Sequence, residues 1–278
     1  MEVIVAKTAG FCFGVKRAVE KVYANVDKEH VYTYGPIIHN EQVVADLEKH
    51  GVKVVEEDTD LTQLSEGTIV VRAHGASRAE FDRLRECGMQ IEDATCPFVS
   101  KIYRIVEEES KAGRTVIIVG NAAHPEVRGI RRWSGEDTYV VGSIEEANNL
   151  NILAKNISIV SQTTFNLKKF KEIVEIFEKK GYDIKCLNTI CNATEVRQTE
   201  ARQIASQVDA MIVIGGKNSS NTQKLFEICK EECSNTYYIQ TAEDLDYTAI
   251  RGMQRIGITA GASTPKNIIE EVQTRCQI

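Results

Sequence analysis

Three of the eight cysteines in this sequence share a spacing and a context, and they are Cys12, Cys96 and Cys191. They lie 23, 24 and 24 residues before Gly35, Gly120 and Gly215, each of which ends an apolar run. Each cysteine also precedes a helical pattern. A thiol at the start of a helix faces the positive end of the helix dipole, which favours the thiolate. The sequence therefore predicts three equivalent thiolates.

The elements that would position these cysteines form a repeat. Six apolar runs rich in Val and Ile each end in a loop of small polar residues, at 31–40, 68–77, 115–126, 157–166, 210–221 and 255–264. Helical patterns lie between them, for example at 77–88, 167–181 and 264–276. Strands that alternate with helices indicate an α/β protein with mainly parallel sheets, in which ligands bind beyond the carboxyl ends of the strands.

The six runs fall into three pairs, which predicts three similar α/β modules, over 12–95, 96–190 and 191–278. The first two modules each end with a further strand that leads into the next cysteine, whereas the third has none. We expect the N-terminal strand, within 1–11, to complete the third module. The modules would then close with pseudo-threefold symmetry, with the three cysteines around the axis.

Three thiolates at one point need a cation between them. A structural zinc site takes a fourth protein ligand, and a catalytic zinc usually has histidine or carboxylate among its three. An iron–sulfur cluster can bridge three helix ends and leave one iron without a cysteine, as an open Lewis-acid and redox site. The alternative is that the cysteines only pack in the core. The glycines of GFCFG and the proline of TCPF favour close approach to a cofactor.

The other five cysteines do not follow the repeat, and we interpret them as small buried apolar residues: Cys87, Cys186, Cys229, Cys233 and Cys276.

Polar residues in the strand-end loops would face the cluster. Three of the five histidines lie there, and they are His39, His74 and His124. Pro125 would hold Glu126 rigidly, and a glutamate in a dry pocket should have a raised pKa and could deliver a proton. The alternative is that Pro125 opens a helix and Glu126 complements its dipole.

A second set of loop residues suits an anion. GGKNSSNT is not a Walker sequence, but it offers Ser219, Ser220 and Asn221 at a predicted helix start. Ser263 and Thr163 add hydroxyls from neighbouring loops. Any one of these could instead be a helix cap. Because a hydrogen bond to a charged group gives about 1.5–3 kcal/mol, several neutral donors could hold a diphosphate.

These motifs closely resemble those of the 4-hydroxy-3-methylbut-2-enyl diphosphate reductases of the non-mevalonate isoprenoid pathway. The matching segments are GFCFGV, RAHGAS, ATCPFV, HPE, SQTT, NTICNATEVRQ, KNSSNT and GAST, and together they span nearly the whole chain. The resemblance implies a two-electron reductive dehydroxylation that yields isopentenyl and dimethylallyl diphosphates.

The resemblance also implies roles for the residues. Cys12, Cys96 and Cys191 would hold one 4Fe-4S cluster with one open iron, to which the allylic hydroxyl binds. Glu126 would supply protons, while Thr163 and His124 order the hydroxyl end. The diphosphate would be bound by a larger set, comprising His39, His74, Ser219, Ser220, Asn221 and Ser263. A ferredoxin or flavodoxin would donate the electrons, and Arg128, Arg131 and Arg132 are a candidate docking patch.

Composition restricts the other possibilities. A formal charge of -6 without a basic tract argues against nucleic-acid binding. The sequence has no apolar window of about 18 residues and no secretion signal, so we expect no membrane span and a cytoplasmic protein. Two other functions stay open: a zinc-thiolate hydrolase of a phosphorylated metabolite, and a non-enzymatic iron–sulfur redox sensor.

Overall fold

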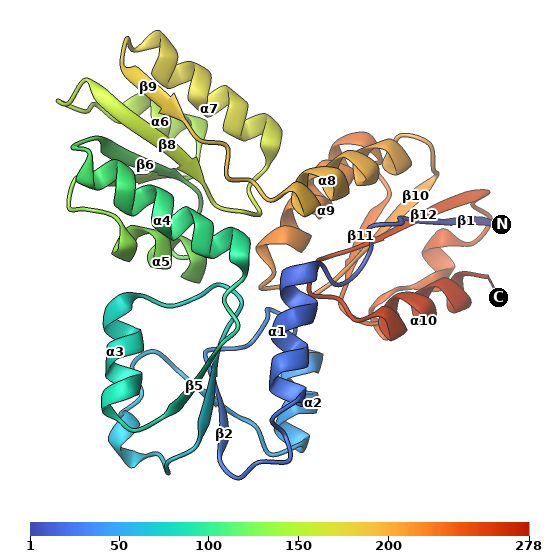
Figure 1. Ribbon diagram of the computed structural model, residues 1–278. Coiled ribbons are helices and arrows are strands. Elements are labelled where there is room, and N and C mark those ends of the chain that lie inside the picture. The colour runs from blue at the N-terminus through green and yellow to red at the C-terminus, as the bar shows by residue number, and fades with distance from the viewer. Residues whose placement is uncertain (278) are drawn as a thin grey trace. The chain divides into compact units, whose positions relative to one another are not determined.

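The computed structural model describes residues 1–277 and contains three four-stranded, wholly parallel sheets (Figure 1). In sheet order these are β3-β2-β4-β5, β7-β6-β8-β9 and β11-β10-β12-β1. The predicted α/β class with parallel sheets is confirmed. The six apolar runs form the two central strands of each sheet, because strands buried on both faces read as continuous Val and Ile runs.

The first sheet and its helices follow one another in this order: α1 (Phe13–Tyr23), β2 (Val31–Tyr34), α2 (Glu41–Lys49), β3 (Lys53–Val55), the short 3-10 helix η1 (Leu61–Gln63), β4 (Thr68–Val71), α3 (Arg78–Glu86) and β5 (Gln90–Asp93).

The second sheet repeats this order with α4 (Pro97–Lys111), β6 (Thr115–Val119), α5 (Pro125–Trp133), β7 (Thr138–Val141), α6 (Ile144–Asn149), β8 (Asn156–Ser161), α7 (Leu167–Lys179) and β9 (Asp183–Cys186).

The third sheet is built from α8 (Asn192–Ala205), β10 (Ala210–Ile214), α9 (Ser220–Glu232), β11 (Thr236–Ile239), η2 (Ala242–Asp244), η3 (Tyr247–Ile250), β12 (Arg255–Ala260) and α10 (Lys266–Cys276), together with β1 (Glu2–Val5) from the start of the chain.

The N-terminal strand takes the place in the third sheet that β5 and β9 take in the other two. β1 pairs in parallel with β12, with Glu2 opposite Arg255 and Val5 opposite Ile258. The pairing expected for this strand is therefore present. The limits drawn for the three modules, and their pseudo-threefold arrangement, stay predictions.

By its internal contacts the chain divides into two compact units. Unit 1 comprises Met1–Glu20, Ile38–His50 and Asn192–Ile278, and unit 2 comprises Lys21–Ile37 and Gly51–Cys191. Unit 2 thus holds the first and second sheets, and unit 1 holds the third sheet with α2.

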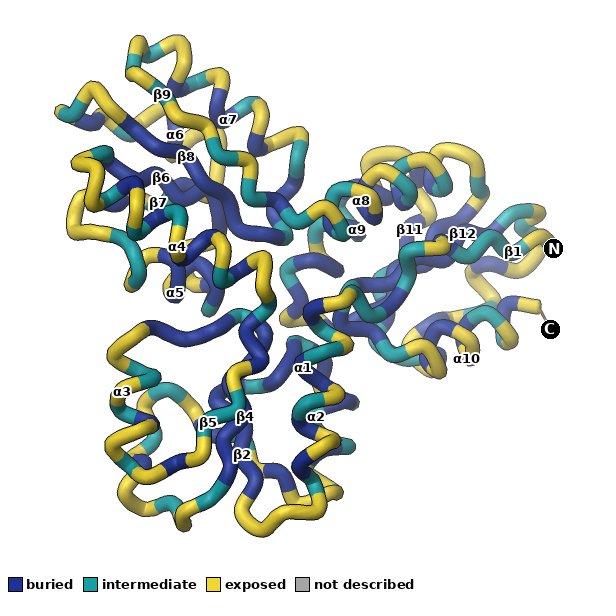
Figure 2. Tube along the Cα trace, viewed as in Figure 1, coloured by how far each residue is buried: buried dark blue, intermediate teal, exposed yellow. Residues whose placement is uncertain are grey.

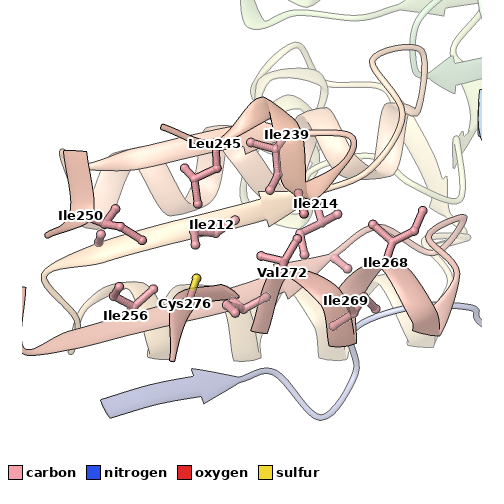
Figure 3. Close-up of a cluster of buried hydrophobic side chains, with 14 residues drawn as sticks. Ile212, Ile214, Ile239, Leu245, Ile250, Ile256, Ile268, Ile269, Val272 and Cys276 are labelled. Carbon is pink, nitrogen blue, oxygen red and sulfur yellow. The ribbon is translucent and has the colours of Figure 1, made fainter. Parts of the chain in front are cut away.

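Helices pack against each sheet through their apolar faces. In the core of unit 1, Ile212 and Ile214 of β10 pack with Val272 and Cys276 of α10 (Figure 3). The central strands are buried along almost their whole length, whereas the outer helices alternate between buried and exposed residues (Figure 2). None of the described helices is both long and apolar enough to cross a bilayer.

Candidate functional site

The three cysteines of the repeat all lie where a loop passes into a helix. Cys96 is the N-cap of α4, and Cys12 and Cys191 directly precede the first residues of α1 and α8. All three are partly exposed cysteines that form no disulfide with another described residue. The predicted position at a helix start is confirmed for each, so the sulfurs sit where a helix dipole favours negative charge.

Each cysteine is tied through its backbone N–H to the loop that follows the second central strand of a sheet. Cys96 donates to the carbonyl of Ala73 at 2.9 Å, and Cys191 donates to that of Thr163 at 3.0 Å. In unit 1, Cys12 donates to Ala262 at 3.4 Å. One main-chain contact therefore recurs three times, and it links every candidate ligand to a loop that carries a candidate substrate residue.

Local conformation accounts for part of the context around the cysteines. Gly10 has a φ of 97°, a region that a side chain would strain, and Pro97 is the first residue of α4, where its missing N–H costs nothing. These two residues are explained by backbone geometry, without a cofactor.

Two charged residues of α8 each bind the backbone of the segment that leads to Cys12. Glu200 accepts the backbone N–H groups of Lys7 and Thr8 at 2.8 and 2.9 Å, and also the hydroxyl of Thr8. Arg197, which is buried, donates to the carbonyls of Thr8 and Gly10 at 2.9 and 2.7 Å. Burial acts to raise the pKa of Glu200, but these hydrogen bonds hold it below its ordinary value. Neither Arg197 nor Glu200 is among the residues that the sequence motifs predict for the site.

In unit 2, Glu126 lies in the first turn of α5 and is 1% exposed. Its two carboxyl oxygens accept from Thr163, one from the backbone N–H at 2.6 Å and one from the hydroxyl at 2.7 Å. His124 is the N-cap of the same helix and accepts the N–H of Glu126 on Nδ1 at 3.1 Å. Pro125 is the first residue of α5, as the alternative interpretation held. Glu126 also lies in the first turn, but it is buried, so it is not an exposed carboxylate that only complements the helix dipole.

Burial raises the pKa of Glu126, because a carboxylate loses its hydration there, and the two hydrogen bonds from Thr163 oppose that rise. The Thr163 hydroxyl can donate to the carboxylate or accept from the carboxylic acid, so it can serve both protonation states. With Nδ1 of His124 accepting, a neutral His124 ring carries its proton on Nε2. This arrangement can hold and release a proton.

His74 lies beside these groups in the loop after β4. Its ring meets the His124 ring edge-on, with 5.2 Å between the centroids. The structure of unit 2 thus brings together His74, His124, Glu126 and Thr163, from three strand-end loops and a helix start.

Unit 1 gathers the remaining polar candidates. Ser219 caps α9, accepting the N–H of Thr222 at 3.3 Å, so the predicted helix start is confirmed. Asn221 is 5% exposed, and neither its Oδ1 nor its Nδ2 is hydrogen-bonded to another group within residues 1–277. Burying an unsatisfied amide is costly, and this one lies in the first turn of a helix, where an anion is favoured.

His39 and Ser263 come to the same place from two other loops. The Ser263 hydroxyl donates to the His39 carbonyl at 3.1 Å. A Cβ on Gly216 would lie 2.7 Å from that carbonyl, and one on Gly261 would lie 3.6 Å from Nδ2 of Asn221. The loops after β10 and β12 and the start of α2 therefore converge within unit 1, with Ser220 half-buried beside Asn221.

The donors fit the groups that the sequence predicts. Cysteine thiols at helix starts are suitable ligands for an iron–sulfur cluster. A buried amide that bonds no other group of residues 1–277, at a helix start, suits the oxygens of a diphosphate.

The structure agrees only in part with the predictions for the other cysteines and for the arginine patch. Cys229, Cys233 and Cys276 are buried and Cys87 is partly buried, in line with packing roles, but Cys186 is exposed and that interpretation was wrong for it. In the candidate docking patch, Arg128 pairs with Glu57 at 2.9 Å and Arg132 pairs with Glu80 at 2.7 Å. Two of its three arginines are therefore partly neutralised within unit 2.

Comparisons with known proteins agree with one another. The LytB protein family model matches residues 3–277. A 4-hydroxy-3-methylbut-2-enyl diphosphate reductase of Caldanaerobacter subterraneus subsp. tengcongensis is 48% identical over 98% of this chain and 95% of its own. The same-named enzyme of Geobacter sulfurreducens is 47% identical over 100% of this chain and 97% of its own.

Solved structures match as well. The reductase of Plasmodium falciparum has a TM-score of 0.93 at 29% identity, covering 99% of this chain and 87% of that one. A structure described as (E)-4-hydroxy-3-methyl-but-2-enyl diphosphate reductase, the terminal enzyme of the non-mevalonate pathway, has a TM-score of 0.71 at 41% identity, covering 100% and 99%. With near-complete coverage by family model, relatives and structures, the chain belongs to the LytB family of 4-hydroxy-3-methylbut-2-enyl diphosphate reductases.

Proposed function

We propose that this chain reduces (E)-4-hydroxy-3-methylbut-2-enyl diphosphate to isopentenyl and dimethylallyl diphosphates. The allylic C–O bond breaks, one proton leaves with the oxygen as water, and a second proton is added to the carbon skeleton. Two electrons, delivered by an external donor, balance the reaction. The main support for the proposal is that the Glu126 carboxyl is buried and hydrogen-bonded by Thr163, in a chain that belongs to this family.

Members of this family use an iron–sulfur cofactor, and we propose Cys12, Cys96 and Cys191 as the ligands of a 4Fe-4S cluster with one open iron. When bound, the cluster supplies the electrons one at a time and a Lewis-acidic iron. The three backbone bonds of the cysteines to Ala262, Ala73 and Thr163 support this assignment, because they fix the main chain of each cysteine relative to its loop.

Glu126 is the proposed proton donor. Its burial keeps the carboxyl protonated to higher pH than an exposed glutamate, and its bond to Thr163 gives the proton a path through a hydroxyl. His124, held by the N–H of Glu126, would orient the hydroxyl end of the substrate.

The diphosphate would be bound by His39, His74, Ser219, Ser220, Asn221 and Ser263. Asn221 supports this assignment most directly, because its buried amide bonds no other group of the described residues and could bond the diphosphate oxygens.

Anaerobic purification and turnover test the proposal. We expect a brown, iron-loaded protein that consumes the hydroxylated diphosphate when reduced. A colourless protein containing zinc would instead support the hydrolase.

Glu126→Gln separates the enzyme from the redox sensor. Because a positioned acid contributes about 10²–10⁴-fold, we expect a loss of at least about 100-fold in turnover with iron content unchanged. Glu145→Gln, an exposed first-turn glutamate of α6, is the matched control and should keep full activity. Full activity in Glu126→Gln would rule out this acid.

We propose a ferredoxin or flavodoxin as the electron donor. Since Arg128 and Arg132 already pair within unit 2, the exposed Arg131 is the better probe of docking. Arg131→Glu should weaken the salt dependence of electron transfer, and an unchanged dependence would exclude this surface.

A further inference from the structure

Tyr103 is a buried tyrosine to which the reaction described above gives no role. It lies on α4, seven residues after Cys96, and is 4% exposed. Its hydroxyl donates to the backbone carbonyl of His74 at 2.6 Å. Burial raises the pKa of Tyr103, so the group stays a hydroxyl donor at any working pH. One residue thus joins the helix that starts at Cys96 to the loop that carries His74.

Two glycines make room for this hydroxyl. A Cβ on Gly75 would lie 2.7 Å from the Tyr103 oxygen, and a Cβ on Gly129 would lie 2.5 Å from it. Gly75 directly follows His74, while Gly129 lies one turn after Glu126 on α5. The hydroxyl is therefore packed between the backbones of two elements that both bear candidate site residues.

Trp133 holds the tyrosine ring from a further side. The two rings are stacked, with 5.4 Å between centroids and 9° between planes. The indole N–H of Trp133 donates to the carbonyl of Ala76 at 3.0 Å, in the same loop as His74. The last residue of α5 and the hydroxyl of Tyr103 therefore both bind the 74–76 segment.

We propose that Tyr103 is a positioning residue, whose hydroxyl fixes the His74 loop against α5, the helix whose N-cap is His124. Its contacts hold the His74 ring at its 5.2 Å edge-on distance from the His124 ring. The inference deepens the proposed function and rests on it, because His74 matters to turnover only if it binds the substrate.

Tyr103→Phe removes the hydroxyl and leaves the ring stack. The His74 carbonyl loses its partner, so we expect KM for the diphosphate substrate to rise about fivefold, equivalent to about 1 kcal/mol. We expect kcat to stay within about twofold, because neither hydrogen bond between Glu126 and Thr163 involves Tyr103. A residue with only a structural role would lower the melting temperature and the active fraction without changing KM.

Gly129→Ala perturbs the Tyr103 hydroxyl from α5. The new methyl would meet the hydroxyl at 2.5 Å but the nearest ring carbon only at 3.2 Å. We expect Gly129→Ala to raise KM by itself, and the double variant with Tyr103→Phe to show the KM of Tyr103→Phe alone. Independent, multiplying effects in the double variant would overturn the proposal.

Trp133, the only tryptophan, gives a readout that needs no cofactor. In metal-free protein we expect its emission to change in Gly129→Ala, where the ring is displaced, and to return toward the wild-type spectrum in the double variant. Tyr139→Phe, an exposed tyrosine of β7, is the matched control and should change nothing.

The outcomes distinguish the two proposals. If the wild-type protein does not turn over the substrate, the proposed function is wrong, independently of the results with the variants. An active wild type with an unchanged KM in Tyr103→Phe, or an unchanged emission in Gly129→Ala, would overturn the role of Tyr103 and leave the reaction in place.

Discussion

Thr163→Val removes one of the two hydrogen bonds that oppose the rise in the pKa of Glu126. The backbone N–H of Thr163 still donates to one carboxyl oxygen, whereas the other oxygen loses its hydroxyl partner. The carboxylate loses a charge-assisted bond and the carboxylic acid loses a weaker neutral one, so the variant disfavours the ionised form. The pKa of Glu126 is therefore expected to rise further.

The size of the effect follows from that difference. A hydrogen bond to a charged group is worth about 1.5–3 kcal/mol and a neutral one about 0.5–1.5 kcal/mol. A difference of about 1 kcal/mol corresponds to about 0.7 pH unit. Because an acid donates only while protonated, activity falls as pH rises through its pKa, and the alkaline limb of the profile should move up by about 0.7 unit.

The assay is kcat/KM against pH for wild type and variant with the same chemical reductant, so that the pH dependence of the reductant cancels in the ratio. The maximum rate should also fall, since the hydroxyl is part of the proposed proton path. Thr163→Ser restores a hydroxyl and should return the limb to its wild-type position. Thr164→Val, which alters a neighbouring hydroxyl bonded to Gln162, should not move it. An alkaline limb in Thr163→Val that stays in place or moves down in pH would show that the Thr163 hydroxyl does not stabilise the ionised form of Glu126.

Two further predictions concern unit 1. Asn221→Leu replaces a buried amide that bonds no other group of the described residues, so chemical denaturation should show a free energy of unfolding about 1 kcal/mol higher. KM for the diphosphate substrate should rise at least about tenfold. A destabilised variant with a normal KM would contradict the diphosphate assignment. Glu200→Gln removes the charge and puts an amide N–H₂ against the donor of either Lys7 or Thr8, because only one acceptor oxygen remains. Bound iron should then be lost faster to a chelator, whereas Glu195→Gln on the same helix should retain it. Equal rates would show that this contact does not support Cys12.

The sequence was most informative where burial is complete. The central strands were predictable because both faces are covered, which demands continuous apolar runs. The edge strands β3, β7 and β11 escaped prediction because they are short and nothing else in the sequence marks them. The other edge strands, β1, β5 and β9, are as short and more exposed, but each leads into a cysteine of the repeat and was predicted from that position.

Some residues around the site also could not be predicted from the sequence. Cysteine, histidine and a glutamate beside proline are recognisable by type, whereas Arg197, Glu200 and Tyr103 act through backbone carbonyls and N–H groups far away in the chain. On a helical pattern these residues look like ordinary surface charges or a core aromatic. Only tertiary contacts show which backbone atoms they hold.

The backbone bond from each cysteine to the loop after the second central strand has a consequence for how such a chain can diversify. A main-chain contact constrains where a loop lies but not which side chain it bears. The cysteine can therefore stay the same in three copies while the tied loops differ, with His74, Thr163 and Ser263 at or next to the bonded residue. An allylic diphosphate has two unlike ends, and loops that keep the same main-chain contact while their side chains differ can offer a different chemical group at each cysteine.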